Sequence, residues 1–445
     1  MPLETQSVDI GRLIDDGRWT GYQRWLVALV AMTIVFDGVD NQLLGIVIPT
    51  VMKEWGVARS AFAPVVSLGY LGMMIGGLVA GLAGDRLGRR TALLGSMVGF
   101  GVLTVAAALV DGPTSLGVLR LLAGIGLGGA MPNAAALAAE YVPLRQRPIA
   151  VTVTIVCVPL GATVAGLLGI RLLPVLGWRT LFVVGGLVPL VAAFVLRGLL
   201  PESPRFLARH PSRWRELFEV MPRMGHVIPP GTRFTDASPH AVARVSIGAL
   251  FGAEWRRDTL ALWGAFFFCL FSVYLGFSWL TSLLTGAGFD PATANTGITA
   301  FNLGGVAGAL LGGVAIARFG SRVSMLVMTA IAIAGAVVLS VMTIDPSAGV
   351  ARIVGMLALT GGMINAVQTT MYALAAHVYP STVRATGVGT AVAIGRFGAI
   401  LTGYGGSWAI DYGGAAAFFR VIALTMALTF IALAIVRRHV PARRP

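Results

Sequence analysis

The sequence has few charged residues and few cysteines. Asp, Glu, Lys and Arg make up only 12% of its 445 residues, about half the roughly 25% found in ordinary soluble domains. This low share excludes an intrinsically disordered chain and an ordinary soluble enzyme. The two cysteines, Cys157 and Cys269, lie in apolar runs and lack the spacing of a metal site or a disulfide framework. We therefore expect both to be small buried side chains.

Several functional signatures are also missing. The first 21 residues are polar, and the first long apolar run begins near Trp25, so no cleavable signal peptide is expected. The net charge of +14 does not indicate a nucleic-acid-binding protein, because the basic residues lie between apolar runs instead of forming one stripe. No nucleophile elbow, metal triad or phosphate loop is found. We expect neither an enzyme nor a cofactor.

Apolar residues dominate the chain. They make up 56% of it, and the mean hydropathy is +0.82. At about 20 residues per membrane span, this content is enough for roughly twelve spanning helices. The 58 glycines allow such helices to approach closely. We expect an all-α membrane protein with twelve transmembrane helices, near residues 22–51, 60–83, 91–111, 115–140, 148–170, 178–198, 258–285, 292–317, 322–344, 349–376, 386–409 and 414–436.

A polar stretch divides these segments into two sets of six. Arginines concentrate in this stretch and in alternate connections, which the positive-inside rule places in the cytoplasm, together with both termini. The expected organisation is a cytoplasmic N-terminal segment (1–21), an N-terminal six-helix half (22–198), a cytoplasmic central loop (199–257), a C-terminal six-helix half (258–436) and a cytoplasmic tail (437–445).

The two halves resemble each other. RLLAGIGLGGAMPN (120–133) matches RIVGMLALTGGMIN (352–365), which lies 232 residues further on. At the same offset, GLAGDRLGRR (81–90) matches GVAIARFGSR (313–322). A third pair, EYVPLRQR (140–147) and HVYPSTVR (377–384), has an offset of 237 residues. Three matches in the same order indicate duplicated halves with pseudo-symmetry.

The first apolar segment contains two acids. Asp37 and Asp40 are three residues apart and share a helix face, which Asn41 extends. Counted from Tyr22, Asp37 lies roughly 22 Å into the helix, close to the middle of the membrane. Acids at this depth usually mark a substrate or proton path, so we expect both to couple transport to protons. The alternative is a structural pair satisfied by an arginine or by backbone groups.

Two arginines lie deep in apolar segments. Arg120 is early in the fourth segment, and Arg396 is about 18 Å deeper than Arg384, between Gly395 and Gly398. A buried guanidinium keeps its charge and requires an anion. Arg396 is the stronger candidate to anchor a substrate carboxylate, with Arg120 as a second. A purely structural partner is the alternative for each.

Two polar or aromatic stripes complete the candidate site. Polar side chains recur at helical spacing on the tenth segment, and aromatic side chains recur at helical spacing on the seventh. Each is either a cavity wall, able to read ring hydroxyls or to stack on a ring, or ordinary interhelical packing. The full expected substrate-binding set is Arg396, Arg120, Asn41, Asn133, Phe271, Tyr274, Asn365, Gln368 and Tyr372.

The loop GLAGDRLGRR resembles the signature loop of the major facilitator superfamily. Asp85 in this loop can pair with an arginine or a helix N-terminus across the seam between the halves. Glu140 lies near the membrane edge and suits gating better than coupling. The expected gating residues are Asp85, Arg86, Arg89, Glu140 and Arg384.

Within that superfamily, the sequence resembles the aromatic acid:proton symporter family. The resemblance rests on DGVD in the first segment, GGAMPNAAALAAEYVP, PESPRFL and YPSTVRATGVGTAVAIGRFGAI, and it covers nearly the whole chain. It implies uptake of benzoate-like or hydroxybenzoate-like anions with protons. It also implicates Asp37, Asp40, Asp85, Arg120, Glu140, Arg384 and Arg396. The chain departs from the family at Ala317, where Asp is usual, and at Ser321, where Arg is usual.

The expected function is therefore proton-coupled import of an aromatic carboxylate such as hydroxybenzoate, benzoate or gentisate, by alternating access. The expected partners are this anion, protons and the lipid bilayer, with no nucleic acid, and the chain is expected to be a monomer in the bacterial inner membrane. Two alternatives stay open: a proton-driven efflux antiporter for aromatic or drug-like compounds, and a transporter-like ligand sensor.

Overall fold

The computed structural model describes residues 7–229, 231–236, 247–252, 254–380 and 383–442. Residues 237–246 of the expected central loop and 443–445 of the expected tail lie outside these ranges. Within them, ten helices are long and apolar enough to cross a membrane. They are α2 (Gly21–Trp55), α3 (Ala63–Leu87), α4 (Arg89–Ala107), α5 (Pro113–Tyr141), α6 (Arg147–Leu199), α9 (Arg256–Gly286), α10 (Pro291–Phe319), α11 (Ser321–Val341), α12 (Val350–Val378) and α13 (Arg384–Ile435).

Two of these helices are interrupted. The backbone of α6 leaves helical geometry at Gly177, and that of α13 does so at Gly413 and Gly414. Gly177 and Gly414 have φ values of 75° and 56°, which glycine adopts without the steric penalty of a side chain. Each break falls between two neighbouring apolar segments of the sequence. Each of these long helices is therefore two helical parts joined by a sharp bend.

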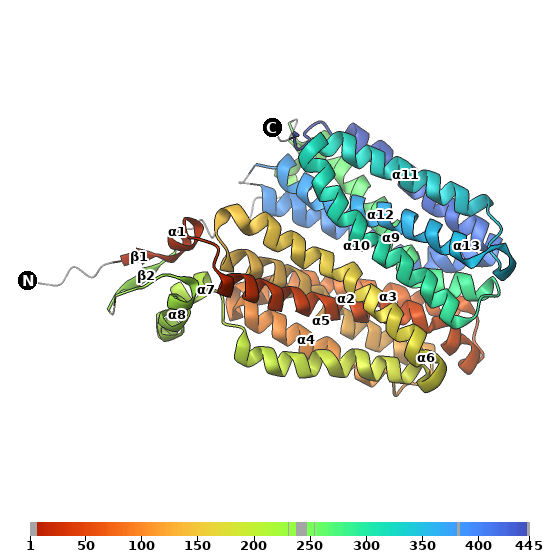
Figure 1. The fold of residues 1–445 in the computed structure, drawn as a ribbon, viewed down its shortest axis with the longest axis horizontal. Coiled ribbons are helices and arrows are strands. Elements are labelled where there is room, and N and C mark those ends of the chain that lie inside the picture. Colours follow the sequence, from red (N-terminus) through yellow and green to blue (C-terminus); the bar gives the residue numbers. More distant parts are fainter. Residues whose placement is uncertain (1–6, 230, 237–246, 253, 381–382, 443–445) are drawn as a thin grey trace, which may run out of the picture.

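The helices form two bundles that lie side by side. Helices α2 to α6 pack together as one half, drawn in red to yellow-green in Figure 1, and α9 to α13 form the other, drawn in green to blue. The internal sequence repeats map onto corresponding helices, since Asn133 lies on α5 and Asn365 on α12. The all-helical membrane fold expected from the sequence is thus confirmed.

Helix α2, which carries both acids, has clear sequence signals at its ends. A capping box forms at its start, where Thr20 and Gln23 each accept the backbone N–H of the other. Gly56 ends the helix in the left-handed conformation, with a φ of 64°. In its middle, Gly38 packs so closely on α6 that an added Cβ would lie 2.2 Å from the carbonyl oxygen of Val158.

The N-terminal segment and the central loop form one small unit outside the bundle. Strand β1 (Ser7–Asp9) pairs in parallel with β2 (Arg233–Thr235), and a separate hydrophobic core joins α1, α7 and α8. Segments 1–21 and 199–257, far apart in the sequence, thus contact each other. The short elements are α1 (Ile10–Asp15), η1 (Arg59–Phe62), η2 (Leu144–Gln146), α7 (Pro204–Ala208), η3 (Pro211–Arg213), α8 (Trp214–Val220), η4 (Pro222–Met224), η5 (Ile247–Phe251) and η6 (Pro346–Ala348).

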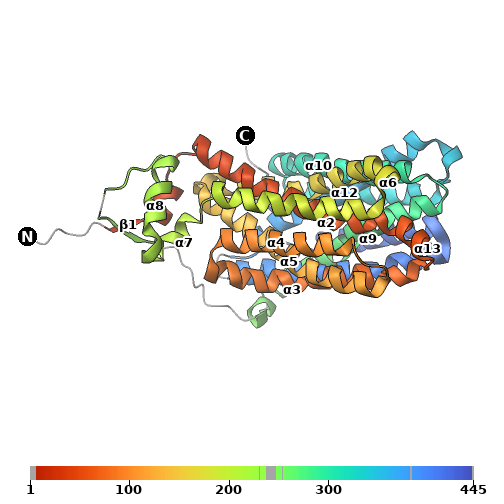
Figure 2. The same cartoon turned by 90° about the horizontal axis from the view of Figure 1, so that it is seen from below.

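This unit, here called the terminal module, projects from one end of the bundle (Figures 1 and 2). Asp15 in α1 binds Arg205 of the central loop at 2.7 Å and also pairs with Arg147 at the start of α6. These contacts attach the terminal module to the first half. We call this end of the bundle the terminal end and the opposite one the distal end.

Candidate functional site

Asp40 and Arg120 form a buried ion pair between α2 and α5. Arg120 Nη1 donates to Asp40 Oδ2 at 3.2 Å, and the two side chains are 5% and 0% exposed. Thr104 on α4 donates its hydroxyl to the same carboxylate and accepts from Arg120 Nη2 at 3.1 Å. The guanidinium also lies 5.1 Å from the ring centre of Phe182. Each charge of this pair is therefore compensated inside the first half.

Asp37 lies one turn away from Asp40 and has different surroundings. Its side chain is also buried, but its Oδ1 atom has no hydrogen-bond partner among the described residues. The charges that act on it most are those of Arg396, across the interface between the halves, and Asp40. Of the two acids expected to couple protons, Asp40 has a direct cationic partner, and Asp37 has none in the part of the chain that the structure describes.

Arg396 projects from α13 towards the first half. Its Nη1 atom donates to the Tyr274 hydroxyl at 3.1 Å and approaches the sulfur of Met73 at 3.7 Å. In the part of the chain that the structure describes, Arg396 forms no ion pair with a carboxylate. A guanidinium held by neutral partners retains the capacity to bind an anion.

Aromatic rings line the interface next to Arg396. The rings of Tyr70 on α3 and Tyr274 on α9 lie 4.6 Å apart between centres, and Phe277 contacts Tyr274 edge to face. The hydroxyls of Tyr70 and Ser278 are hydrogen-bonded at 2.7 Å. The two halves therefore meet through aromatic faces and hydroxyl groups beside a cation.

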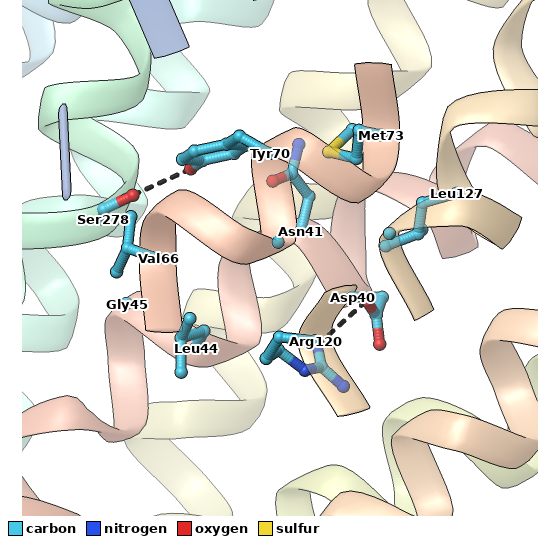
Figure 3. Close-up of a pocket in the computed structure, with 12 residues that line it drawn as sticks. Asp40, Asn41, Leu44, Gly45, Val66, Tyr70, Met73, Arg120, Leu127 and Ser278 are labelled. Atoms are coloured by element: carbon cyan, nitrogen blue, oxygen red, sulfur yellow. Dashed lines mark hydrogen bonds and ion pairs between the residues drawn. The ribbon is translucent and has the colours of Figure 1, made fainter. Parts of the chain in front are cut away.

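A small cavity lies between these groups and the buried ion pair. It has a volume of about 30 Å³, and its lining includes Asp40, Asn41, Tyr70, Arg120 and Ser278. Figure 3 shows Asn41 and Tyr70 on one side of it and the Asp40–Arg120 pair on another. Sites for small organic ligands usually measure roughly 300–1,000 Å³. In this conformation the cavity is too small for an aromatic acid.

Other expected binding residues do not line this cavity. Asn133 donates to the carbonyl groups of Ala80 on α3 and Gly129 on its own helix, so its amide links two helices of the first half. Asn365 donates to the carbonyl group of Gly361 on its own helix. Phe271 lies against Gly405 of α13. On α12, Gln368 is half-buried, and half-buried Tyr372 contacts the ring of Phe266 at 5.4 Å.

The expected gating residues lie at the terminal end. Arg89 binds Asp85 at 2.6 Å and Glu140 at 3.6 Å, all within the first half. Arg86 is exposed, and Arg384 donates to the carbonyl of Tyr379 at 3.2 Å in the second half. Asp85 therefore has its arginine partner in its own half in this conformation, not across the seam. Ser321, at a position where the family usually has arginine, accepts the backbone N–H of Val440 at 2.8 Å instead.

The contacts between the halves that the sequence analysis missed lie towards the distal end. Arg59 binds Asp411 at 2.5 Å and Ser282 at 3.2 Å. Gln42 donates to the carbonyl of Phe277 at 2.8 Å and accepts from Asn302 at 3.1 Å, and both amides are buried. Isolated polar residues in apolar helices were the sequence signal for such contacts, but the sequence does not show which of these residues face the other half.

The fold and this interface define a class. Two helical halves that meet around buried charges near mid-membrane are typical of secondary transporters. The family model described as Major Facilitator Superfamily matches residues 30–351 and, in a second match, 261–445. The chain belongs to this superfamily and is a membrane transporter, not an enzyme.

The names of similar proteins specify a narrower class of transporter than the family model does. The chain is 36% identical over 399 residues to the gallate transporter of Pseudomonas putida, covering 90% of this chain and 88% of the relative. It is also 36% identical to a 4-hydroxybenzoate transporter of Acinetobacter baylyi, with 91% and 88% covered. The gentisate transporter of Corynebacterium glutamicum is 31% identical, with 83% of this chain and 77% of the relative covered. The aromatic-acid transporter resemblance is confirmed.

A solved structure supports the fold. A bacterial homologue of the human lysosomal transporter Spinster, described as inward-facing and occupied, matches with a TM-score of 0.66. The match covers 94% of this chain and 97% of the other, at 16% identity. Similarity at this identity concerns the architecture alone.

Proposed function

We propose that this protein is a proton-coupled symporter that imports an aromatic carboxylate, such as a hydroxybenzoate, benzoate, gentisate or gallate. The observation that carries the proposal is Arg396, a cation that has no carboxylate partner in the described ranges and lies beside a cluster of aromatic rings. A guanidinium matches a carboxylate in two parallel hydrogen bonds. The tyrosine faces suit an aromatic ring. The names of the relatives support the same substrate class.

The proposed topology has twelve spans in the bacterial inner membrane. Helix α6 has 53 residues and α13 has 52, which corresponds to roughly 80 Å if straight, against a hydrocarbon core of about 30 Å. Each therefore crosses the membrane twice, turning at its glycine break. The arginine-rich terminal end faces the cytoplasm, together with both termini. The two bundles correspond to the six-helix halves 22–198 and 258–436.

We propose that the structure represents the inward-facing state. The inter-half hydrogen bonds and ion pairs found among the described residues lie from mid-bundle to the distal end, and include Arg59–Asp411 and Gln42–Asn302. These contacts close the distal, periplasmic side. Rocking of the halves around the central residues then alternates access, with substrate bound near mid-membrane.

Proton coupling is assigned to Asp37. Asp40 is paired with the Arg120 cation and accepts a hydrogen bond from Thr104, whereas among the described residues a buried charge on Asp37 has no hydrogen-bonding cation to offset its desolvation. Protonation removes that cost. Protonation of Asp37 also leaves Arg396 as an uncompensated cation, which increases its attraction for a substrate carboxylate. Deprotonation on the cytoplasmic side reverses this and favours release.

The test is uptake into proteoliposomes of radiolabelled 4-hydroxybenzoate, driven by an inward proton gradient, with and without a protonophore. Symport predicts accumulation that the protonophore abolishes and that gallate, benzoate and gentisate inhibit to different degrees, whereas glucose does not. An outward gradient distinguishes the antiporter alternative, which accumulates substrate only in that orientation. Proton-driven movement of a non-aromatic compound alone contradicts the substrate class.

A further inference from the structure

A groove runs along the outer face of the first half, between α4 and α6. It has a volume of about 620 Å³, and its walls are mainly apolar side chains from both helices, namely Leu94, Val98, Leu190, Ala193 and Phe194. Phe194 is 81% exposed, which is expected for a surface in contact with lipid. Figure 1 shows the second part of α6 along the lower edge of the bundle, away from the other half. The groove is thus separate from the central cavity.

Two arginines close the groove at the terminal end. Arg90 is in the first turn of α4, and Arg197 is in the last turn of α6. Arg90 donates to the backbone carbonyl of Arg197, which holds the two side chains near each other. In the described ranges neither guanidinium forms an ion pair with a carboxylate. Arg197 is exposed.

A carboxylate beside this end, that of Glu202, already binds backbone groups. Glu202 is fully buried and accepts the backbone N–H groups of Arg90, Thr91 and Ser203 at 2.9–3.4 Å. It therefore caps the start of α4, where the helix dipole favours a negative charge. The two guanidinium groups keep donors available for an anion at the membrane surface.

We propose that this groove binds an anionic phospholipid of the cytoplasmic leaflet. One acyl chain fills the apolar groove, and the headgroup phosphate lies between Arg90 and Arg197. Basic pockets between helices on the cytoplasmic side have this recognition chemistry, and guanidinium binds phosphate through paired hydrogen bonds. The assignment of the leaflet rests on the proposed topology.

One substitution in the groove can exclude the acyl chain of the lipid without removing a charged side chain. Gly95 lines the groove, and a Cβ added there meets no atom within 4 Å. Gly95→Leu therefore fills the groove without a clash in the bundle. Gly313→Leu is the matched control, because Gly313 lies on α10 of the other half, is exposed and also has open space around it.

The headgroup end has its own pair of variants. Arg197→Gln removes one cation, and Arg322→Gln is its control, since Arg322 opens α11 at the position that Arg90 occupies in the first repeat and is exposed. Neither Gly95 nor Arg197 belongs to the proposed transport site. Loss of lipid binding and loss of transport are thus measured separately.

The experiment is native mass spectrometry of the full-length protein in detergent, titrated with phosphatidylglycerol or with phosphatidylcholine of the same acyl chains. We expect wild type to retain phosphatidylglycerol at least fivefold better. Gly95→Leu should weaken binding of both lipids, and Arg197→Gln should reduce phosphatidylglycerol to the level of phosphatidylcholine, with both controls unchanged. Equal retention of the two lipids by wild type, or equal losses in Arg197→Gln and Arg322→Gln, overturns the proposal. Unchanged retention of both lipids by Gly95→Leu would show an anion site that does not use the groove, which also overturns the proposal.

Discussion

At the scale of single residues, two acids three positions apart have different environments. Asp40 is part of a closed network with Arg120 and Thr104, and Asp37 faces the interface with no hydrogen bond at Oδ1 from any described residue. A fixed ion pair holds helices together in every state of a cycle, whereas an unpaired acid can change its charge. In the proposed mechanism, the chemistry of coupling therefore rests on Asp37, and Asp40 supports the helix that carries it.

Asp37→Asn should separate binding from coupling. Asparagine keeps the shape of the protonated carboxyl but carries no ionisable proton. We expect exchange of labelled for unlabelled 4-hydroxybenzoate across the liposome membrane to persist, while accumulation driven by a proton gradient is lost. Normal accumulation in this variant would remove Asp37 from the coupling role. When Asn41→Asp, on the same helix face, is added to Asp37→Asn, we do not expect coupling to return.

Asp40→Asn should affect stability more than Asp37→Asn does. It leaves the Arg120 guanidinium buried without its counter-ion, and breaking a buried ion pair from one side costs about 3–5 kcal/mol. Adding Arg120→Gln should recover part of this loss, since no uncompensated charge remains. Thermal unfolding midpoints in detergent measure all three proteins. A double variant no more stable than Asp40→Asn would contradict the assignment of the pair.

Arg396→Lys should weaken substrate binding while keeping the positive charge. Lysine cannot form two parallel hydrogen bonds with a carboxylate, and one charge-assisted hydrogen bond contributes roughly 1.5–3 kcal/mol. We expect the Kd for 4-hydroxybenzoate to rise by about tenfold to a hundredfold, as measured by isothermal titration calorimetry. Arg384→Lys, at the terminal end, is the control and should leave the Kd unchanged.

Residue patterns predicted part of this site. Depth and spacing were sufficient to select Asp37, Asp40, Arg120 and Arg396, because charged residues in apolar helices are rare. The same reasoning did not find Thr104 or Tyr70, since hydroxyl groups are common in membrane helices and carry little signal. It also did not distinguish Asn133, which braces two helices, from a residue that faces a cavity, because one sequence does not show which neighbour a helix face meets.

At the scale of elements, helix contacts depend on where glycine allows backbones to touch. An added Cβ at Gly38 would lie 2.2 Å from Val158 O, and one at Gly161 would lie 2.1 Å from Val35 O. The two glycines thus form a reciprocal contact between α2 and α6. The 58 glycines of the sequence predicted close packing in general, but geometry was needed to locate this pair.

Gly38→Ala should destabilise the first half. The new methyl group clashes with backbone atoms, which cannot move as a flexible side chain does, so α2 and α6 must separate. We expect a clear loss of folded yield and a lower unfolding midpoint in detergent. Gly95→Ala, where a Cβ meets open space, should be neutral or slightly stabilising because alanine favours the helix. Equal effects of the two substitutions would contradict this account.

At the scale of the whole molecule, the repeats predicted two halves, but not which end of the bundle is closed. Repeats reflect ancestry and topology, whereas the state depends on a small balance of contacts between the halves. Arg59–Asp411 is the ion pair that joins the halves among those of the described residues. The side chains of Arg59 and Asp411 are 17% and 49% exposed, so the pair contributes about 0.2–1 kcal/mol after solvent screening.

Arg59→Gln should therefore shift the equilibrium towards the outward-facing state by up to about fivefold. Spin labels at Ser115 and Thr296, exposed residues at the distal ends of the two halves, report the opening as a longer distance in pulsed electron resonance. High salt should produce a similar, smaller shift in wild type, because it screens a partly exposed pair. The charge-swapped double variant, Arg59→Asp with Asp411→Arg, should restore the short distance. An unchanged distance distribution in Arg59→Gln would show that the buried amides Gln42 and Asn302, together with the aromatic faces, hold the distal end closed without the ion pair.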